Sequence, residues 1–480
     1  MSMNRRGAMT SLGLAGPALW AAGAAAATSP QANAAKAPIK GAMAGLAAVD
    51  GKSVTNKPHA YEVMEQYGID GLVALDPMNV YYLTNTIPLM TTFRQTYPAF
   101  AVFARDQKQP TYLVTAPPQA LALASRAERG EELPVLIGYS GVPNWQDYVN
   151  ASPQQLKVEP STGAKVGESA PNSHGWPSTT GAHTSIEKRW VKAQEETFNN
   201  GATTKAWALA KALKDAGLAK GKIAVDDMRV AYLLQQIGMT GVTCIPGENI
   251  FRRIRVVKSP VELALMRIAG ENNSNATEVT MRSIKPGMTS ADIEHIFAVE
   301  CAKLGSSAVT FLTGMALAGL PDGKIVEGKS FAVDAVSMFR EYHGDCGRTL
   351  VVGEPNKEIK ARAKAHRAGY DEIYAKIKAG MKLSDVRRIG KDAMVKAGMP
   401  EATIVVNPHS VGVEHGDNPM RDDLPFDMVD DITLQENMVI TADLASLDLG
   451  WGNLHHEDLI RITKTGFEPF PGIHEPFIII

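Results

Sequence analysis

Five residues in the C-terminal half of this 480-residue sequence have side chains that could bind metal ions together, and they are Asp334, Asp345, His409, Asp443 and Glu457. Asp334, Asp443 and Glu457 adjoin short apolar runs that predict buried strands. An acidic side chain in such a strand is costly unless it is paired or bound to a cation. Carboxylate oxygens with one imidazole suit Mn²⁺, Fe²⁺, Co²⁺ or Zn²⁺ better than copper or an iron–sulfur cluster. Each residue alone is also compatible with a surface or hairpin position, so the metal site is a hypothesis about the whole set.

The segments around these residues contain an internal duplication. Residues 284–305 and 377–398 are identical at 8 of 22 positions, at a constant offset of 93 and without gaps. Each copy predicts a turn followed by a helix that ends at a glycine. A unit of this length that occurs only twice indicates a pseudo-twofold domain rather than a solenoid. We therefore expect the candidate site in the crevice between two related half-domains.

The N-terminal half has the pattern of an α/β layer domain. A strand over Gly71–Leu75 and another over Val80–Thr84 are predicted around an Asp76-Pro77 turn. The other predicted elements are strands over Ala99–Ala104, Thr111–Thr115 and Lys222–Val225, and helices over His59–Gly68, Ile186–Ala216 and Arg229–Ile237. Strands and helices in alternation indicate an α/β layer domain.

A helix start marks the approach to the C-terminal domain. Residues 259–262 read Ser-Pro-Val-Glu, which places a capping serine, a proline at the first helical position and a glutamate three residues after the cap. The domain boundary is placed just upstream, because 480 residues exceed the usual size of one domain. The predicted organisation is an export signal (1–34), a linker (35–57), an α/β domain (58–249) and an α+β domain with the duplication (250–480).

Composition argues against several classes of protein. The 49 basic and 51 acidic residues give a net charge of −2, so no basic excess is available to neutralise the phosphates of a nucleic acid. The body of the chain has no apolar run of about 20 residues, so the mature protein is not expected to span a membrane. Three scattered cysteines are too few for a disulfide framework or a thiolate cluster.

The N-terminal 34 residues have the pattern of a secretory signal. Arg5-Arg6 precede an apolar stretch rich in alanine and glycine, which ends in Ala32-Asn33-Ala34. The paired arginines resemble a twin-arginine signal, with an unstructured alanine-rich tail as the alternative. We expect cleavage near Ala34 and a periplasmic location. Residues 160–185 have no periodicity and predict a functional loop or an insertion.

The order of the five candidate ligands resembles that of the M24 metallopeptidase family, which includes methionine aminopeptidase, Xaa-Pro aminopeptidase, prolidase and creatinase. Gly71–Thr84 resembles the N-terminal domain of the creatinase and prolidase branch, and Arg255–Glu262 resembles the start of its catalytic domain. The resemblance covers most of residues 60–470. It implies a creatinase-like α/β domain, an α+β pita-bread catalytic domain, a homodimer, and a hydrolase of the Xaa-Pro dipeptidase or aminopeptidase type that acts on short peptides or small molecules.

The resemblance also implies a site with two divalent metal ions, which would be Mn, Co, Zn or Fe. Asp345 and Glu457 would bridge the two ions, Asp334 would bind one, and His409 with Asp443 would bind the other. Such ions lower the pKa of a bridging water, which attacks the amide carbonyl that they polarise. The proton would pass to the leaving nitrogen through His415, with His343 and His455 as the alternatives. The simpler interpretations are that His343 only caps a hairpin and that His455 only hydrogen-bonds a ligand carboxylate.

Several residues depart from the family pattern around the ligands. They are Asp443 in place of glutamate, Val336 in place of glycine, no histidine near Leu320–Asp322, His415 six residues after His409 instead of seven, and His455 in place of an arginine. We therefore expect weak turnover of simple Xaa-Pro dipeptides, because a shift in spacing moves a side chain away from the reacting atoms. The alternatives are creatinase-like C–N hydrolysis or a lyase reaction on the same scaffold, and a binding protein without catalysis.

Overall fold

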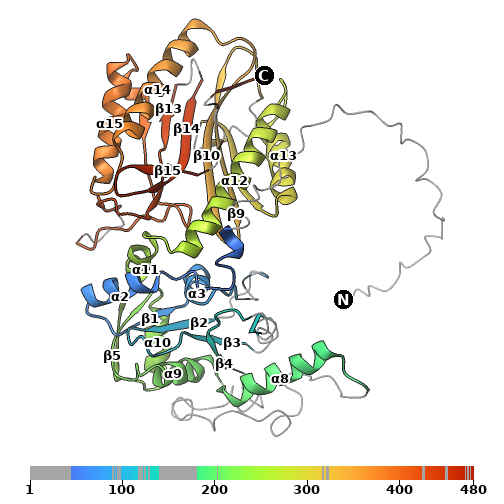
Figure 1. Ribbon diagram of the computed structural model, residues 1–480, viewed down its shortest axis with the longest axis vertical. Helices are drawn as coiled ribbons and strands as arrows, with labels where there is room; N and C mark the ends of the chain where they lie inside the picture. The colour runs from blue at the N-terminus through green and yellow to red at the C-terminus, as the bar shows by residue number, and fades with distance from the viewer. Residues whose placement is uncertain are drawn as a thin grey trace, which may run out of the picture. The chain divides into compact units, whose positions relative to one another are not determined.

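The computed structural model describes residues 45–480 apart from 89, 90, 92, 94–98, 117–122, 124, 125, 128, 129, 140–180, 203, 316, 317, 320–323, 424–427, 449–451, 471, 473, 474 and 476. The predicted export signal, residues 35–44 of the linker, most of the 160–185 segment and positions 320–322 lie outside the described residues. The described chain contains two β-sheets with associated helices (Figure 1). Among the described helices, none combines the length and the apolar character that a bilayer crossing requires.

The N-terminal sheet is mixed and has the strand order β4-β3-β2-β1-β5-β6. Its strands are β1 (Gly71–Ala74), β2 (Phe100–Ala104), β3 (Tyr112–Thr115), β4 (Val135–Gly138), β5 (Gly221–Val225) and β6 (Val242–Pro246). The neighbouring helices are α2 (Lys57–Gln66), α3 (Pro77–Thr84), α8 (Ser185–Asn199), α9 (Lys205–Asp215), α10 (Arg229–Gln236) and α11 (Glu248–Arg255). β1, β2 and β3 are buried along their whole length, which explains their continuous apolar runs.

The strand predicted over Val80–Thr84 is wrong, because these residues form the end of helix α3. The Asp76 side chain accepts hydrogen bonds from the backbone N–H groups of Met78 and Asn79, and Pro77 occupies the first helical position. The predicted turn is therefore a helix cap. Six of the eight residues of α3 are buried, so the segment lacks the one-sided apolar pattern that identifies a surface helix.

The single helix predicted over Ile186–Ala216 is also wrong, since the structure has α8 and α9 in its place. The helices are separated at 200–204, where Thr204 caps α9 by accepting a hydrogen bond from the backbone of Trp207. The side chain of Asn200 donates to the carbonyl of Leu136 on β4. Local polar contacts therefore end one helix and start the next.

The C-terminal sheet has the main strand order β11-β13-β14-β10-β9-β7-β8, with β12 and β15 beside β14 and β16 beside β10. Its strands are β7 (Ser307–Met315), β8 (Ala318–Gly319), β9 (Ser330–Phe339), β10 (Tyr342–Val351), β11 (Ile404–Val406), β12 (Val439–Thr441), β13 (Leu444–Ser446), β14 (Leu454–Ile462), β15 (Phe467–Pro469) and β16 (Phe477–Ile479). The helices are α12 (Pro260–Ser283), α13 (Ser290–Lys303), α14 (Lys357–Lys376) and α15 (Leu383–Lys396), with a short 3₁₀ helix at Glu401–Thr403.

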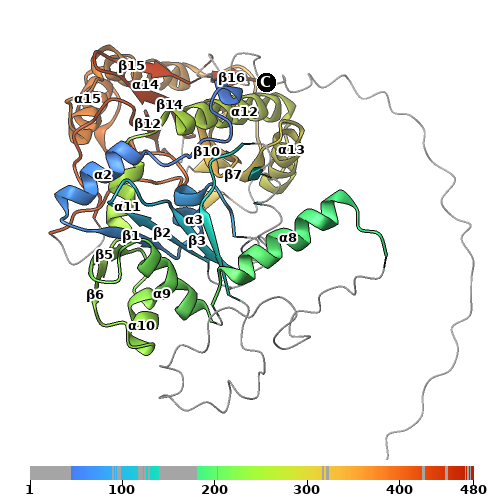
Figure 2. The same cartoon turned by 60° about the horizontal axis from the view of Figure 1, so that its bottom comes forward.

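The two helix pairs of this domain repeat one another. α12 leads through a turn into α13, and α14 leads through a similar turn into α15 (Figure 2). At equivalent positions of the turns, Gly287 and Gly380 have φ angles of 87° and 90°, which only glycine adopts readily. Asp292 and Asp385 then each accept a hydrogen bond from the backbone three residues earlier. Separate apolar clusters join each pair to the sheet, so the predicted duplication is confirmed.

Candidate metal centre

Three neighbouring strands place the acidic side chains on one face of the C-terminal sheet. Asp334 on β9 lies opposite Gly347 on β10, and Gly347 lies opposite Glu457 on β14. Asp345 is two residues before Gly347 and therefore faces the same side. Asp334 and Glu457 lie in the middle of their strands and not at the strand ends that the apolar runs suggested. Strand pairing thus brings Glu457 beside Asp334 and Asp345, which lie more than a hundred residues earlier in the chain.

Loops at the edge of these strands supply the remaining candidates. Asp443 lies between β12 and β13, and His409 lies between β11 and β12. His409 Nε2 is 3.7 Å from Asp345 Oδ2 and 3.5 Å from Glu457 Oε1. Donor atoms of His409, Asp443 and Glu457 all lie within 4.8 Å of one another, as do those of Asp334, His455 and Glu457. The structure therefore brings all five predicted ligands into one cluster.

Of the three predicted proton-transfer histidines, His415 and His455 contact this cluster, and His343 lies beside His415. His415 Nε2 is 3.0 Å from Asp345 Oδ2, and the rings of His343 and His415 are 6.2 Å apart. His455 Nε2 is 3.0 Å from Asp443 Oδ1. His343 belongs to β10 and contacts the carbonyl of Gly412 with both its backbone N–H and its ring, so it does not cap the hairpin turn.

Burial and mutual repulsion perturb the carboxylates of the cluster. Burial raises the pKa of Asp334 to about 6, and the neighbouring carboxylates add to this rise. Burial, with the charges of Asp345 and Asp443, raises the pKa of Glu457 well above its usual value. Burial would also raise the pKa of Asp345, but the hydrogen bond from His415 lowers it. Positive charge is therefore needed where these side chains meet.

The histidines of the cluster indicate the same need for positive charge. Burial opposes a proton on His455, yet the hydrogen bond to Asp443 and the charges of the cluster raise its pKa to about 10. The hydrogen bond with Asp345 raises the pKa of His415 in the same direction, although burial opposes it. The carboxylates of the cluster therefore favour the protonated form of both imidazoles.

Two carboxylate oxygens in the cluster have unmet bonding capacity. Oδ1 of Asp334 and Oδ1 of Asp345 are both buried, and neither has a hydrogen-bond partner among the described residues. A buried acceptor without a donor is unfavourable by about 1–3 kcal/mol, and by more when it is charged. A divalent cation bound by these oxygens would remove that cost. The residues present therefore fit a site for divalent metal ions with oxygen and imidazole ligands.

The loop from 409 to 418 explains how His415 reaches the cluster despite its shorter spacing from His409. The backbone N–H of Gly412 donates to the carbonyl of Glu414, and that of Asp417 donates to the carbonyl of Ser410, at 2.9 and 2.8 Å. These bonds compact the loop and direct the ring of His415 towards Asp345. The expectation that the shorter spacing moves this side chain out of the site is wrong.

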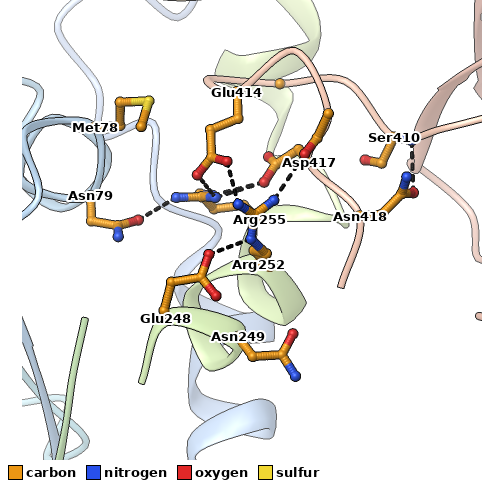
Figure 3. Close-up of polar contacts among 12 residues, drawn as sticks. Met78, Asn79, Glu248, Asn249, Arg252, Arg255, Ser410, Glu414, Asp417 and Asn418 are labelled. Carbon is orange, nitrogen blue, oxygen red and sulfur yellow. Dashed lines mark hydrogen bonds and ion pairs between the residues drawn. The ribbon is translucent and has the colours of Figure 1, made fainter. Parts of the chain in front are cut away.

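A buried ionic network anchors this loop, and no residue of it was predicted as functional. Arg255 on α11 donates to the carboxylates of Asp417 and Glu414 and to the side-chain oxygen of Asn79 on α3 (Figure 3). Lys258 Nζ lies 3.6 Å from Asp417 Oδ2, and both side chains are fully buried. The network joins the N-terminal α/β domain to the histidine-bearing loop. Arg255 and Lys258 belong to the segment that resembles the start of an M24 catalytic domain. Their partners in the network are too distant in the sequence for the pairing to be inferred from it.

The fold and the site together define a pita-bread protein with a cluster of carboxylates and histidines in its C-terminal domain. Residues 264–464 match the model of metallopeptidase family M24. Similar solved structures include the Xaa-Pro dipeptidase from Bacillus anthracis, at a TM-score of 0.62 and 15% identity over 92% of this chain and all of the other. X-Pro aminopeptidase from Thermotoga maritima gives a TM-score of 0.61 at 14% identity over 87% of this chain and all of the other. The match and these structures together support an M24-type metallopeptidase domain over residues 264–464.

Curated relatives are similar over about half of the chain. The probable dipeptidase PepE of Mycobacterium tuberculosis is 23% identical over 249 residues, which cover 50% of this chain and 65% of the relative. The Xaa-Pro dipeptidase of Pyrococcus horikoshii is 25% identical over 228 residues, which cover 46% of this chain and 63% of the relative. The matched part therefore amounts to less than two thirds of the length of either relative.

Proposed function

We propose that this protein is a metal-dependent peptidase that hydrolyses an amide bond of short peptides. The convergence of five candidate ligands carries the proposal, since Asp334, Asp345, His409, Asp443 and Glu457 meet on one face of the sheet. The buried carboxylate oxygens without partners support a metal-bound state. The match to family M24 and the dipeptidase names of the relatives support the reaction class.

These five residues would hold two divalent ions, as four carboxylates would balance two dications. When bound, such ions lower the pKa of a water molecule and polarise an amide carbonyl. Asp345 and Glu457, each near the ring of His409, would be the carboxylates shared by the two ions. His409 and Asp443 would hold one ion on one side, and Asp334 would hold the other.

His415 is the residue that we assign to proton transfer. Its side chain is 46% exposed while that of its partner Asp345 is 0% exposed, so His415 can meet both substrate and solvent. The hydrogen bond to Asp345 orients the ring with Nε2 towards the cluster. His343 has its ring against the Gly412 carbonyl and lies behind His415, which suits it to support this ring.

The identity of the substrate follows less directly from the site. The relatives named Xaa-Pro dipeptidase favour a peptide that ends in proline. The replacement of the usual arginine by His455 favours a second candidate, which is hydrolysis of a C–N bond in another small amide. We expect weak turnover of simple Xaa-Pro dipeptides, because the histidine that the resemblance places near the substrate has no counterpart in the sequence near Leu320–Asp322.

A substrate panel tests this proposal. Metal-free protein is supplied separately with Mn²⁺, Co²⁺ or Zn²⁺ and assayed on Gly-Pro, Ala-Pro, longer Xaa-Pro peptides, small non-peptide amides and creatine, which is a guanidino compound. Metal-dependent hydrolysis of any peptide supports a peptidase, and hydrolysis of creatine or of the non-peptide amides alone supports the second candidate. Wild-type protein that binds none of the metals would overturn the metal-dependent peptidase. A kcat/KM of about 10⁴ M⁻¹s⁻¹ or more on simple Xaa-Pro dipeptides would contradict the expected weak turnover.

A further inference from the structure

We propose that His455 is itself a metal ligand, so that the cluster offers an imidazole nitrogen to each of its two halves. His409 would serve the half that contains Asp443. His455 would serve the half that contains Asp334, since donor atoms of His455, Asp334 and Glu457 form a group within 4.8 Å. This inference rests on the proposed function, because it requires that metal ions bind here.

The orientation of the ring leaves one nitrogen for this role. His455 Nδ1 lies 2.9 Å from the carbonyl oxygen of Val333. A carbonyl can only accept a hydrogen bond, so Nδ1 carries a proton and donates it. Nε2 then points into the acidic cluster, 3.0 Å from Asp443 Oδ1 and 3.6 Å from Glu457 Oε2. Metal-binding histidines are commonly oriented in this way, by a backbone carbonyl behind the ring.

The charge balance of a metal-loaded site determines whether Nε2 of His455 carries a proton or binds a metal ion. The side chain of His455 is 2% exposed, so water does not compensate its charge. Four carboxylates balance two dications, and a protonated His455 would add an unpaired positive charge in a buried place. A neutral ring whose Nε2 donates its lone pair to a metal ion avoids that charge. It also avoids pointing a lone pair at two carboxylates without a cation between them.

Gly347 supplies the room that this arrangement needs. A Cβ atom at Gly347 would lie 2.4 Å from Cε1 and 2.6 Å from Nδ1 of His455, closer than such atoms can approach. Gly347 is not among the glycines with a positive φ angle, so its own backbone conformation does not require glycine. The missing side chain therefore accommodates the ring of His455 on the neighbouring strand.

Two substitutions separate ligation from hydrogen bonding. In His455→Asn the amide nitrogen replaces Nδ1 and keeps a donor for the carbonyl of Val333, but nothing replaces Nε2. In His455→Gln the amide instead reaches the place of Nε2 and offers no imidazole. His295→Gln is the matched control, because His295 is an exposed histidine on α13.

The protein is loaded with Mn²⁺, and pulsed EPR counts the imidazole nitrogens coupled to the metal, while competition with a chelator measures affinity. We expect couplings from two distinct imidazoles in the wild type and in His295→Gln. Both His455 variants should lose one coupling and bind one of the metal ions at least about 100-fold more weakly. Thermal unfolding of the metal-free variants checks that they are folded.

The outcomes distinguish the two proposals. Unchanged nitrogen couplings in a folded His455 variant, even with weaker metal binding, would show that His455 only orients Asp443, and would overturn this inference while leaving the metallopeptidase standing. Wild-type protein that binds no Mn²⁺, Co²⁺ or Zn²⁺ would overturn the proposed function and this inference with it.

Discussion

Replacement of Arg255 by glutamine tests whether the buried ionic network holds the histidine-bearing loop in place. The side chains of Arg255 and Asp417 are 1% and 0% exposed, so the substitution leaves a buried carboxylate without its main partner. Breaking a buried ion pair in this way costs about 3–5 kcal/mol. Asp417 retains Lys258 at 3.6 Å, and Glu414 retains Arg252 at 2.6 Å, which places the expected loss near the lower end.

Urea unfolding of the metal-free protein measures this loss without the stabilisation that bound metal would add. Arg253→Gln is the matched control, because Arg253 lies on the same helix and also pairs with two aspartates. Its side chain is 21% exposed and its partners Asp422 and Asp430 are 48% and 33% exposed. Pairs that exposed contribute about 1 kcal/mol at most.

The loop gives this prediction a second readout. Asp417 lies in the loop that carries His409 and His415, so releasing it should weaken the binding of Zn²⁺ or Mn²⁺ by about tenfold or more, as does loss of other residues that orient ligands. The control should bind these ions like the wild type. An Arg255→Gln protein with the unfolding free energy of the control would refute the energetic reasoning. Unchanged metal affinity would refute the positioning of the loop.

Three further substitutions test the cluster and a buried carboxylate of the N-terminal domain. Glu457→Gln should lose bound metal and nearly all activity while the protein stays folded, because a carboxylate that offsets two dications is gone; elemental analysis and turnover check this. His415→Asn should keep its metal and lose about 10²–10⁴-fold in kcat, and a loss of metal instead would show that it is a ligand. Burial raises the pKa of Asp226 to about 6, so the native state keeps a proton that the unfolded chain releases near pH 4. Asp226 should then contribute a fall of up to about 3 kcal/mol in the free energy of unfolding as pH rises from about 4 through 6. Asp226→Asn, but not Asp227→Asn, should reduce the total fall by that amount, while buried carboxylates such as Asp334 keep their own share.

The candidate ligands were predictable because their chemistry is visible in isolation. Asp334 and Glu457 interrupt apolar runs, and an acidic residue in such a place needs a compensating cation. The duplicated turns were predictable for a related reason, since Gly287 and Gly380 mark the same positive φ at the same offset. In each case the signal lies within a few residues of the feature that it predicts.

The features that were missed depend on contacts between distant segments. Arg255 and its partner Asp417 are 162 residues apart, and nothing in either neighbourhood indicates the pairing. Helix α3 was taken for a strand because burial on nearly all sides removes the periodicity that identifies a helix. Sequence patterns report which residues avoid water, whereas the partner that each one meets is decided by the packing of the whole chain.

Two of the departures from the family pattern, the shorter spacing to His415 and the histidine at position 455, therefore have different consequences. The shortened spacing to His415 looked like the loss of a side chain from the site, but loop hydrogen bonds and the Arg255 network return that ring to Asp345. The ring of His455 occupies space that Gly347 leaves free, because a Cβ atom at that position would clash with it. A compensated spacing preserves the site, whereas a new imidazole among the carboxylates alters which metal ions it prefers. The chemistry that distinguishes this protein from its relatives should accordingly be sought at His455.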